Sequence, residues 1–128
     1  MTVIAQLRRY DLVYLATPYT KFIGGIEKAF EEAARLTARL LVDGVAVYSP
    51  IVHCHPVAIH GKLDPLDHKI WLPFNGAMMK VSRALAVATM PGWRESFGVT
   101  EEIRWFNARW IPVIYFDPVT LEAVDLDG

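Results

Sequence analysis

Apolar residues in this chain form short continuous runs that alternate with longer amphipathic stretches. The runs are apolar almost throughout, as is typical of parallel strands covered on both faces, and they lie at residues 11–17, 45–49, 84–90 and 111–116. Residues 26–43 and 96–108 instead repeat apolar side chains at helical spacing. Short joins between these segments predict right-handed units of strand, helix and strand.

The segment between the second and third strands has a less regular pattern. Residues 51–65 are rich in His and show no clear period, so we expect an irregular loop, followed by a helix over about residues 66–80 that Pro73 and Gly76 interrupt. The tail, residues 117–128, either adds a short strand or packs loosely. The order of elements predicts a single α/β domain over residues 1–128. We expect a doubly wound, flavodoxin- or Rossmann-like three-layer sandwich with a parallel sheet of four to five strands.

Composition narrows the range of partners. Of the 128 residues, 53 % are hydrophobic and 21 % charged, which is a globular composition. The net charge of −1 gives no electrostatic reason to expect nucleic acid or an anionic membrane as partner. No apolar run approaches the roughly 18 residues of a membrane span. Cys54 is the only cysteine, so no disulfide can form within the chain, and a reducing cytoplasm fits best.

The third strand leads through a turn into a helix that starts near Ser96 and carries a candidate carboxylate. One apolar stripe of this helix is formed by Val99, Ile103, Phe106 and Trp110. At about 100° per residue, Glu102 lies at the edge of the stripe, whereas Glu101 points nearly opposite, toward solvent. Ligands of open α/β sheets bind outside the carboxyl ends of the strands, so we expect Glu102 at the rim of a ligand site.

The start of this helix also has the features of an anion site. Ser96 is a favoured N-cap type, and Gly98 lets a ligand approach the backbone closely. The unpaired N–H groups and the positive dipole end are expected to hold an anion and to keep Glu102 ionised, with a low pKa. In the alternative interpretation Ser96 only caps the helix, and Glu101 and Glu102 only favour its dipole. Trp93, in the preceding loop, either stacks on a base or caps the core.

The His-rich segment contains residue types that bind metals: His53, Cys54, His55, His60, Asp64, Asp67 and His68. Their spacing matches no standard zinc pattern. We therefore expect a polar loop over a pocket, with the histidines contacting substrate or solvent, and no metal site. A metal-dependent hydrolase built on this loop is the weaker alternative.

Two of these motifs together resemble the nucleoside 2-deoxyribosyltransferase family, which includes the 2′-deoxynucleoside 5′-monophosphate N-glycosidases. The family opens with a strand of the form Tyr-Leu-Ala-Gly-Pro-Phe/Tyr, and this chain has Tyr14-Leu-Ala-Thr-Pro-Tyr19. After a later strand the family has Asp or Ser, a Gly two residues on and a Glu six residues on. Ser96, Gly98 and Glu102 follow that pattern here. The order of elements matches as well, so the resemblance spans about residues 11–116.

The resemblance implies cleavage or transfer at the N-glycosidic bond of a nucleoside or nucleoside 5′-monophosphate. Glu102 would be the nucleophile that forms a covalent glycosyl-enzyme, and Ser96 would contact the phosphate. Asp67 is a candidate acid for the leaving base. The substrate-binding residues implied are Tyr14, Thr17, Tyr19, Asn75, Trp93, Ser96 and Gly98. No metal or organic cofactor is implied, and relatives complete their pockets across subunits, so we expect a homodimer or a larger homo-oligomer.

The chain departs from the family at three positions. Thr17 stands where the family prefers Gly, and Asn75 and Arg83 stand where the family has acids. Asn75 can hydrogen-bond a base but cannot donate a proton as an acid does. These departures keep a second hypothesis open, in which the protein is a catalytically silent module that binds or senses a nucleotide.

Overall fold

The structure, a computed structural model, describes residues 1–126 and contains four strands and five helices within that range. In chain order the elements are α1 (Ile4–Leu7), β1 (Val13–Ala16), α2 (Ile26–Val42), β2 (Val47–Tyr48), α3 (Pro50–Gly61), α4 (His68–Val81), β3 (Ala84–Ala88), α5 (Phe97–Ala108) and β4 (Val113–Phe116). Each predicted strand is present, and the helices expected over residues 26–43, 66–80 and 96–108 correspond to α2, α4 and α5.

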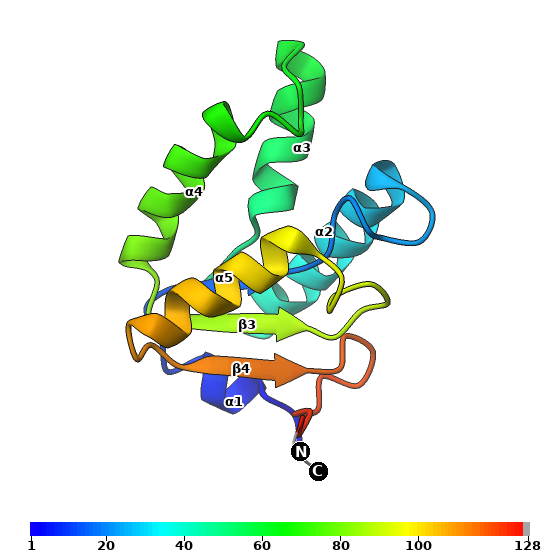
Figure 1. Cartoon of the computed structure of the whole chain (residues 1–128). Coiled ribbons are helices and arrows are strands. Elements are labelled where there is room, and N and C mark those ends of the chain that lie inside the picture. The colour runs from blue at the N-terminus through cyan, green and yellow to red at the C-terminus, as the bar shows by residue number, and fades with distance from the viewer. Residues whose placement is uncertain (127–128) are drawn as a thin grey trace.

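The four strands form one parallel sheet in the order β2-β1-β3-β4. Val13 pairs with Ala84 and Ala16 with Val87, which places β1 and β3 at the centre of the sheet. Helices cover both faces (Figure 1). The predicted α/β sandwich with a parallel sheet is therefore confirmed, with four strands.

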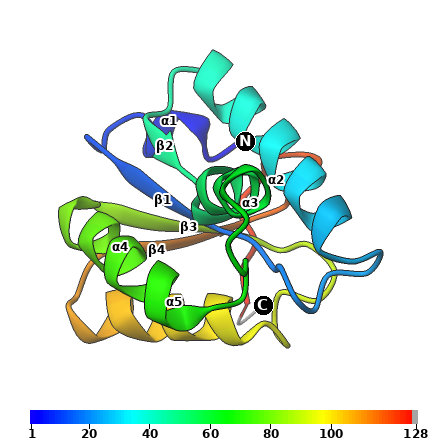
Figure 2. The same cartoon turned by 90° about the horizontal axis from the view of Figure 1, so that it is seen from above.

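Alternate residues of β1 divide the core between the two faces of the sheet. Val13 and Leu15 pack with α1 and α2 in one hydrophobic cluster. Tyr14 and Ala16 pack on the opposite face with α5 and part of α4. All four side chains are fully buried. The view from above shows α2 and α5 on opposite sides of the strands (Figure 2). Tyr14 is thus the β1 residue that brings a hydroxyl group to the α5 face.

The prediction of an irregular loop at residues 51–65 is wrong, because helix α3 occupies most of that segment. Ser49 caps it, its hydroxyl accepting a hydrogen bond from the Val52 amide at 3.3 Å, and Pro50 fits the first helical position. The helix ends where Lys62 takes a left-handed conformation, with φ at 57°. Apolar residues lie on all sides of α3, so its sequence lacks the helical period that prediction requires.

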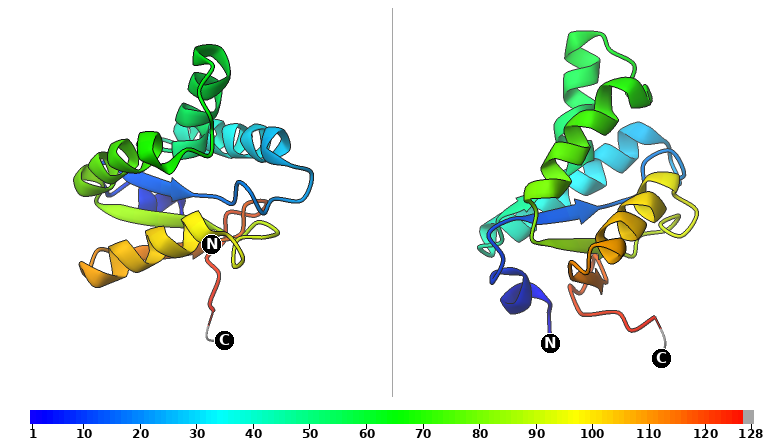
Figure 3. Two further views of the ribbon diagram at one scale, coloured as in Figure 1. Left: turned by 45° about the horizontal axis from the view of Figure 1, so that its top comes forward. Right: turned by 60° about the vertical axis from the view of Figure 1, so that its left-hand side comes forward.

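Helices α3 and α4 project together away from one face of the sheet (Figures 1 and 3). Helix α4 forms despite Pro73 and Gly76, and Asp67 caps it by accepting a hydrogen bond from the Lys69 amide at 3.0 Å. Trp110, assigned above to the apolar stripe of α5, is 94 % exposed. The reason is that α5 ends at Ala108 and Trp110 takes a positive φ of 59°, which turns it away from the core.

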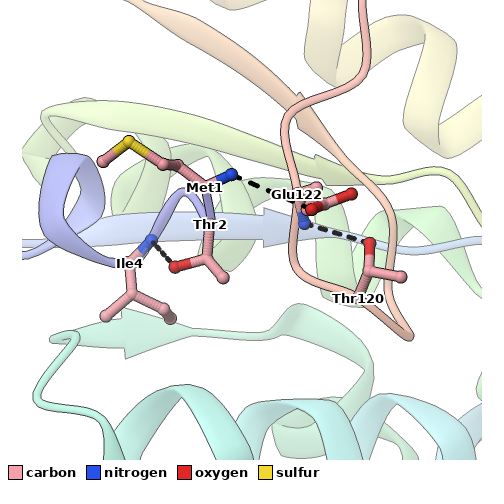
Figure 4. A network of polar contacts seen from close by, with 5 residues as sticks. All are labelled: Met1, Thr2, Ile4, Thr120 and Glu122. Carbon is pink, nitrogen blue, oxygen red and sulfur yellow. Dashed lines mark hydrogen bonds and ion pairs between the residues drawn. The ribbon is translucent and has the colours of Figure 1, made fainter.

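The first two residues of the chain pair with the tail that follows β4. Thr2 and Glu122 form an antiparallel bridge, and the Met1 ammonium group lies 3.8 Å from the Glu122 carboxylate (Figure 4). A second single bridge joins Phe116 to Ala123. The tail up to residue 126 therefore adds isolated bridges and not a strand, and residues 127–128 lie outside the described part. None of the helices described is long and apolar enough to cross a membrane.

Candidate active site

A cavity of about 760 Å³ lies on the α5 face of the sheet, next to the carboxyl end of β1. Residues from α3, α4 and α5 line it together with residues from β1 and the loop that follows. The volume is within the range of ligand sites, about 300–1,000 Å³. Its position also agrees with the rule that ligands of open α/β sheets bind at the carboxyl ends of the strands.

The fold brings most of the predicted site residues together around this cavity. Those that line it are Tyr14, Thr17, Tyr19, Asn75, Ser96, Gly98 and Glu102. They come from segments far apart in the sequence, so their convergence is a property of the fold. Trp93 and Asp67 are not among the lining residues.

Glu102 is half-buried in the second turn of α5 and lines the cavity. Burial of the carboxyl group raises the pKa of Glu102 to about 8, and the neighbouring Tyr14 hydroxyl acts in the opposite direction. The low pKa expected from the sequence is therefore wrong. The physical reason is that the helix dipole acts mainly within the first turn, while the loss of hydration acts on the whole charged group.

Two buried hydroxyl groups at the cavity have no hydrogen-bond partner within the described residues, those of Tyr14 and Thr17. Burial, together with the nearby Glu102, raises the pKa of Tyr14, so its hydroxyl stays protonated as a donor. Unpartnered buried hydroxyls are costly in a folded protein, typically by about 1–3 kcal/mol. A polar ligand that reaches these groups would recover that cost.

The N-terminus of α5 forms another part of the wall. The Ser96 hydroxyl accepts a hydrogen bond from the Val99 amide at 3.2 Å, so the predicted capping role is confirmed. Its hydroxyl hydrogen remains available as a donor. A Cβ placed on Gly98 would meet no protein atom within 4 Å, which leaves open space beside the backbone. The amides of the first turn have no partner inside the helix. This end of α5 can therefore approach an anionic or hydroxyl-bearing ligand closely.

Asn75 reaches the cavity from α4 and is held by two neighbours. Its Oδ1 atom accepts a hydrogen bond from the Tyr48 hydroxyl at 3.0 Å and a weaker one from the Cys54 thiol at 3.8 Å. The NH₂ group of Asn75 is then the part left to donate to a ligand. Cys54 itself is buried, and burial raises the pKa of its thiol, so the thiol is not an activated nucleophile.

Trp93 and Asp67 have structural positions outside the cavity. Trp93 packs against Tyr115 with ring centroids 5.7 Å apart, and the Arg94 guanidinium lies over the Trp93 ring, 4.7 Å from its centroid. This agrees with the alternative interpretation that Trp93 covers the core. Asp67 caps α4, as described above. Neither side chain is placed to contact a ligand in the cavity.

Sequence reasoning missed several cavity residues. Arg104 and Arg109 contribute positive charge from α5, and Trp105 contributes a ring. Glu101 also reaches the rim, although we expected it to face solvent. Its side chain is 43 % exposed and pairs with Arg104 at 2.9 Å. By helical spacing these residues lie outside the apolar stripe of α5, so the sequence predicts that they face solvent. They line a cavity because α4 lies beside α5.

His55 is a further cavity residue whose position the sequence did not reveal. It lies on α3, lines the cavity and contacts both Tyr19 and Glu27. The His-rich segment was recognised, but its histidines were assigned to an irregular loop. Within residues 1–126, no group of three or more His, Cys, Asp and Glu side chains is arranged to hold a metal ion.

Comparison with known proteins gives one family. The family described as "Domain of unknown function (DUF1937)" matches residues 11–117, which is most of the chain. None of the curated proteins matches. The matched range begins just before β1 and ends just after β4, so it contains the whole sheet and all the residues that line the cavity.

Proposed function

The chain belongs to the DUF1937 family, and we propose that it cleaves the N-glycosidic bond of a nucleoside or nucleoside 5′-monophosphate with Glu102 as the nucleophile. The observation that carries this proposal is the placement of Glu102, Ser96 and Gly98 on the wall of one cavity of nucleotide size. A carboxyl group, an anion-binding helix end and open space for a ligand are the three parts that this chemistry needs.

In the proposed reaction the Glu102 carboxylate attacks the anomeric carbon of the sugar. The bond to the base breaks, its electron pair moves to the base nitrogen, and a glycosyl ester forms on Glu102. Water then releases the sugar in a hydrolase, whereas a second base takes it in a transferase. The Tyr14 hydroxyl, buried beside Glu102, would donate a hydrogen bond to the carboxylate as it is regenerated.

The pKa of about 8 affects how this nucleophile works. At neutral pH most of the free protein carries a protonated Glu102, so only a minority is ready to attack. A carboxylate with a raised pKa is in turn a more basic and stronger nucleophile than an ordinary one. Of the two arginines at the cavity, Arg104 is paired with Glu101, so it is the charge of Arg109 that favours a substrate carrying a phosphate.

A panel of nucleosides and nucleoside 5′-monophosphates, with release of free base followed by chromatography, tests the proposal. The wild type should release base from at least one compound, and Glu102→Gln should abolish that release while ligand binding persists. Glu101→Gln is the matched control, because it removes a neighbouring charge that pairs with Arg104 at the rim, and it should stay close to wild type. Full activity of Glu102→Gln would rule out the assignment.

The second candidate function is a catalytically silent nucleotide-binding module. Two observations favour it. Glu102 is largely neutral at pH 7, and Asn75 offers amide hydrogens where the nucleoside 2-deoxyribosyltransferase family, which the sequence resembles, has an acid. For such a module, calorimetry should detect nucleotide binding in the same cavity, and no compound in the panel should release base.

We also propose that the protein works as a homodimer or larger assembly in the cytoplasm. Exposed apolar side chains are concentrated on the extension formed by α3 and α4: Val57, Ile59, Leu63, Leu66, Ile70, Leu72 and Phe74. Large exposed apolar patches commonly mark contact surfaces. Light scattering at micromolar concentration should give a mass of two chains or more, and a monomer mass would contradict this.

A further inference from the structure

Three side chains beside the cavity form a connected chain of hydrogen bonds that the proposed reaction has not yet used. The Tyr19 hydroxyl is hydrogen-bonded to Nδ1 of His55, and Nε2 of the same ring lies 2.9 Å from a carboxylate oxygen of Glu27. Tyr19 and His55 both line the cavity, whereas the Glu27 side chain is 67 % exposed to solvent. The chain of contacts therefore leads from the cavity through a buried ring to the surface.

The surrounding fold holds the central ring in place. The His55 side chain is only 2 % exposed, and the Phe30 ring stacks on it with centroids 4.7 Å apart and an interplanar angle of 21°. Residues on three segments meet here: Tyr19 follows β1, Glu27 and Phe30 lie on α2, and His55 lies on α3. A histidine whose two ring nitrogens both have fixed partners can pass a proton to and from one defined group.

We infer that Tyr19, His55 and Glu27 form an acid–base relay that gives a proton to the leaving base and later takes one from the attacking water. This inference rests on the proposed glycosidic cleavage. Tyr19 is the catalytic residue of the relay because it would touch the base. His55 and Glu27 act through Tyr19 and are positioning residues.

The protonation state of His55 decides which way the Tyr19 hydroxyl points. In the neutral ring Nε2–H donates to Glu27, and Tyr19 donates to Nδ1, so its hydrogen is turned away from the ligand. In the imidazolium form Nδ1–H donates to the Tyr19 oxygen, and the Tyr19 O–H is free to donate into the cavity. In both forms the Glu27 carboxylate accepts the Nε2–H hydrogen bond, so it fixes the orientation of the ring, as the carboxylate of a catalytic triad does.

The proton count balances over the two steps. When the glycosidic bond breaks, the Tyr19 proton moves to the base nitrogen, the Nδ1 proton moves to the Tyr19 oxygen, and His55 becomes neutral. When water attacks the glycosyl ester on Glu102, the water proton passes to the Tyr19 oxygen and the Tyr19 proton returns to Nδ1. Glu102 leaves as a carboxylate and His55 is again positive, so the acid of the first step is the base of the second.

A pair of substrates with the same sugar separates this relay from a structural role. One is the best nucleoside of the panel, whose base needs a proton to leave, and the other is the 4-nitrophenyl glycoside, whose leaving group does not. Tyr19→Phe and His55→Gln should slow base release about 100-fold or more, the usual size of acid catalysis, while the burst of nitrophenol stays within about threefold of wild type. After the burst the variants should turn over slowly, because the base of the second step is missing.

Two further variants keep the test valid if substitution of the buried His55 ring impairs folding. Glu27→Gln changes an exposed side chain and should give a smaller loss, about fivefold to tenfold, confined to the nucleoside. Glu31→Gln, one turn further along α2, removes a charge outside the relay and should match wild type. Equal losses on both substrates, or no loss on the nucleoside, would overturn the relay. A wild type inactive on both substrates would overturn the proposed function itself, and the relay with it.

Discussion

Glu102→Gln should be more stable than the wild type, and the difference in the free energy of unfolding should grow as the pH rises. In the wild type, burial raises the pKa of this carboxyl from its ordinary value of 4.5 to about 8. Below pH 4.5 the group is protonated in both the folded and the unfolded chain. Between pH 4.5 and about 8 only the unfolded chain ionises, so the folded state loses stability as the pH rises, and above about 8 the loss is complete. Gln stays neutral and escapes this loss.

The magnitude follows from the two pKa values. At about 1.4 kcal/mol for each pKa unit, the interval from 4.5 to about 8 corresponds to an upper limit of about 5 kcal/mol. Because Glu102 is half-buried at a cavity that water can enter, we expect about 2–5 kcal/mol. For a domain of 128 residues this is a large part of the free energy of unfolding, typically about 5–15 kcal/mol.

Urea denaturation of the wild type and the variant between pH 5 and pH 9 measures this difference directly. The free energy of unfolding of Glu102→Gln relative to wild type should grow with pH up to about 8 and then level off. Glu101→Gln is the control, since its side chain is 43 % exposed and its curve should run parallel to wild type. If Glu102→Gln also runs parallel to wild type over the whole range, the carboxyl is ordinary and the reasoning from burial fails.

Three further predictions concern the proposed reaction. Because the carboxylate is the reactive form, kcat/KM for the 4-nitrophenyl glycoside, whose leaving group needs no acid, should rise about tenfold per pH unit up to about pH 8 and then flatten, and a profile flat from pH 5 would mean an ordinary Glu102 pKa. Gly98→Ala should fold at least as well as wild type, since the methyl group meets no protein atom within 4 Å, but it should weaken ligand binding in calorimetry. Gly76→Ala, where a methyl group on α4 has equal space, should leave ligand binding unchanged. Ser96→Ala should lower the stability by about 1 kcal/mol through loss of the cap and should weaken monophosphate binding about tenfold more than nucleoside binding; equal losses would leave only the capping role.

The elements predicted correctly are those whose sequence carries one clear period. The runs at β1 and β3 are apolar on both faces because both faces are covered, and α2 has a single apolar side that packs on the sheet. Helix α3 was missed for the opposite reason. It packs against α2 and β1, faces the cavity and leaves Val57 and Ile59 exposed, so no single side of it is apolar.

The candidate site was predicted where its residues lie close in sequence and missed where they do not. Ser96, Gly98 and Glu102 belong to one helix, so their relation could be read from spacing. The contact between His55 and Glu27 joins residues 28 positions apart and depends on how α3 packs on α2. The raised pKa of Glu102 likewise depends on the walls that other helices supply, which helical spacing alone does not contain.

The central claim, that Glu102 is a glycosylated nucleophile, is tested most directly by trapping the intermediate. A nucleoside with fluorine at the 2-position of the sugar slows the release of the sugar more than its transfer to the enzyme, so the glycosyl ester should accumulate. Mass spectrometry of the intact protein should then show the added mass of the fluorinated sugar, and peptide mapping should place it on Glu102. The Glu102→Gln variant should form no adduct, whereas the Glu101→Gln variant should still carry the adduct on Glu102. An adduct on another residue, or base release by the wild type without any adduct, would contradict the account.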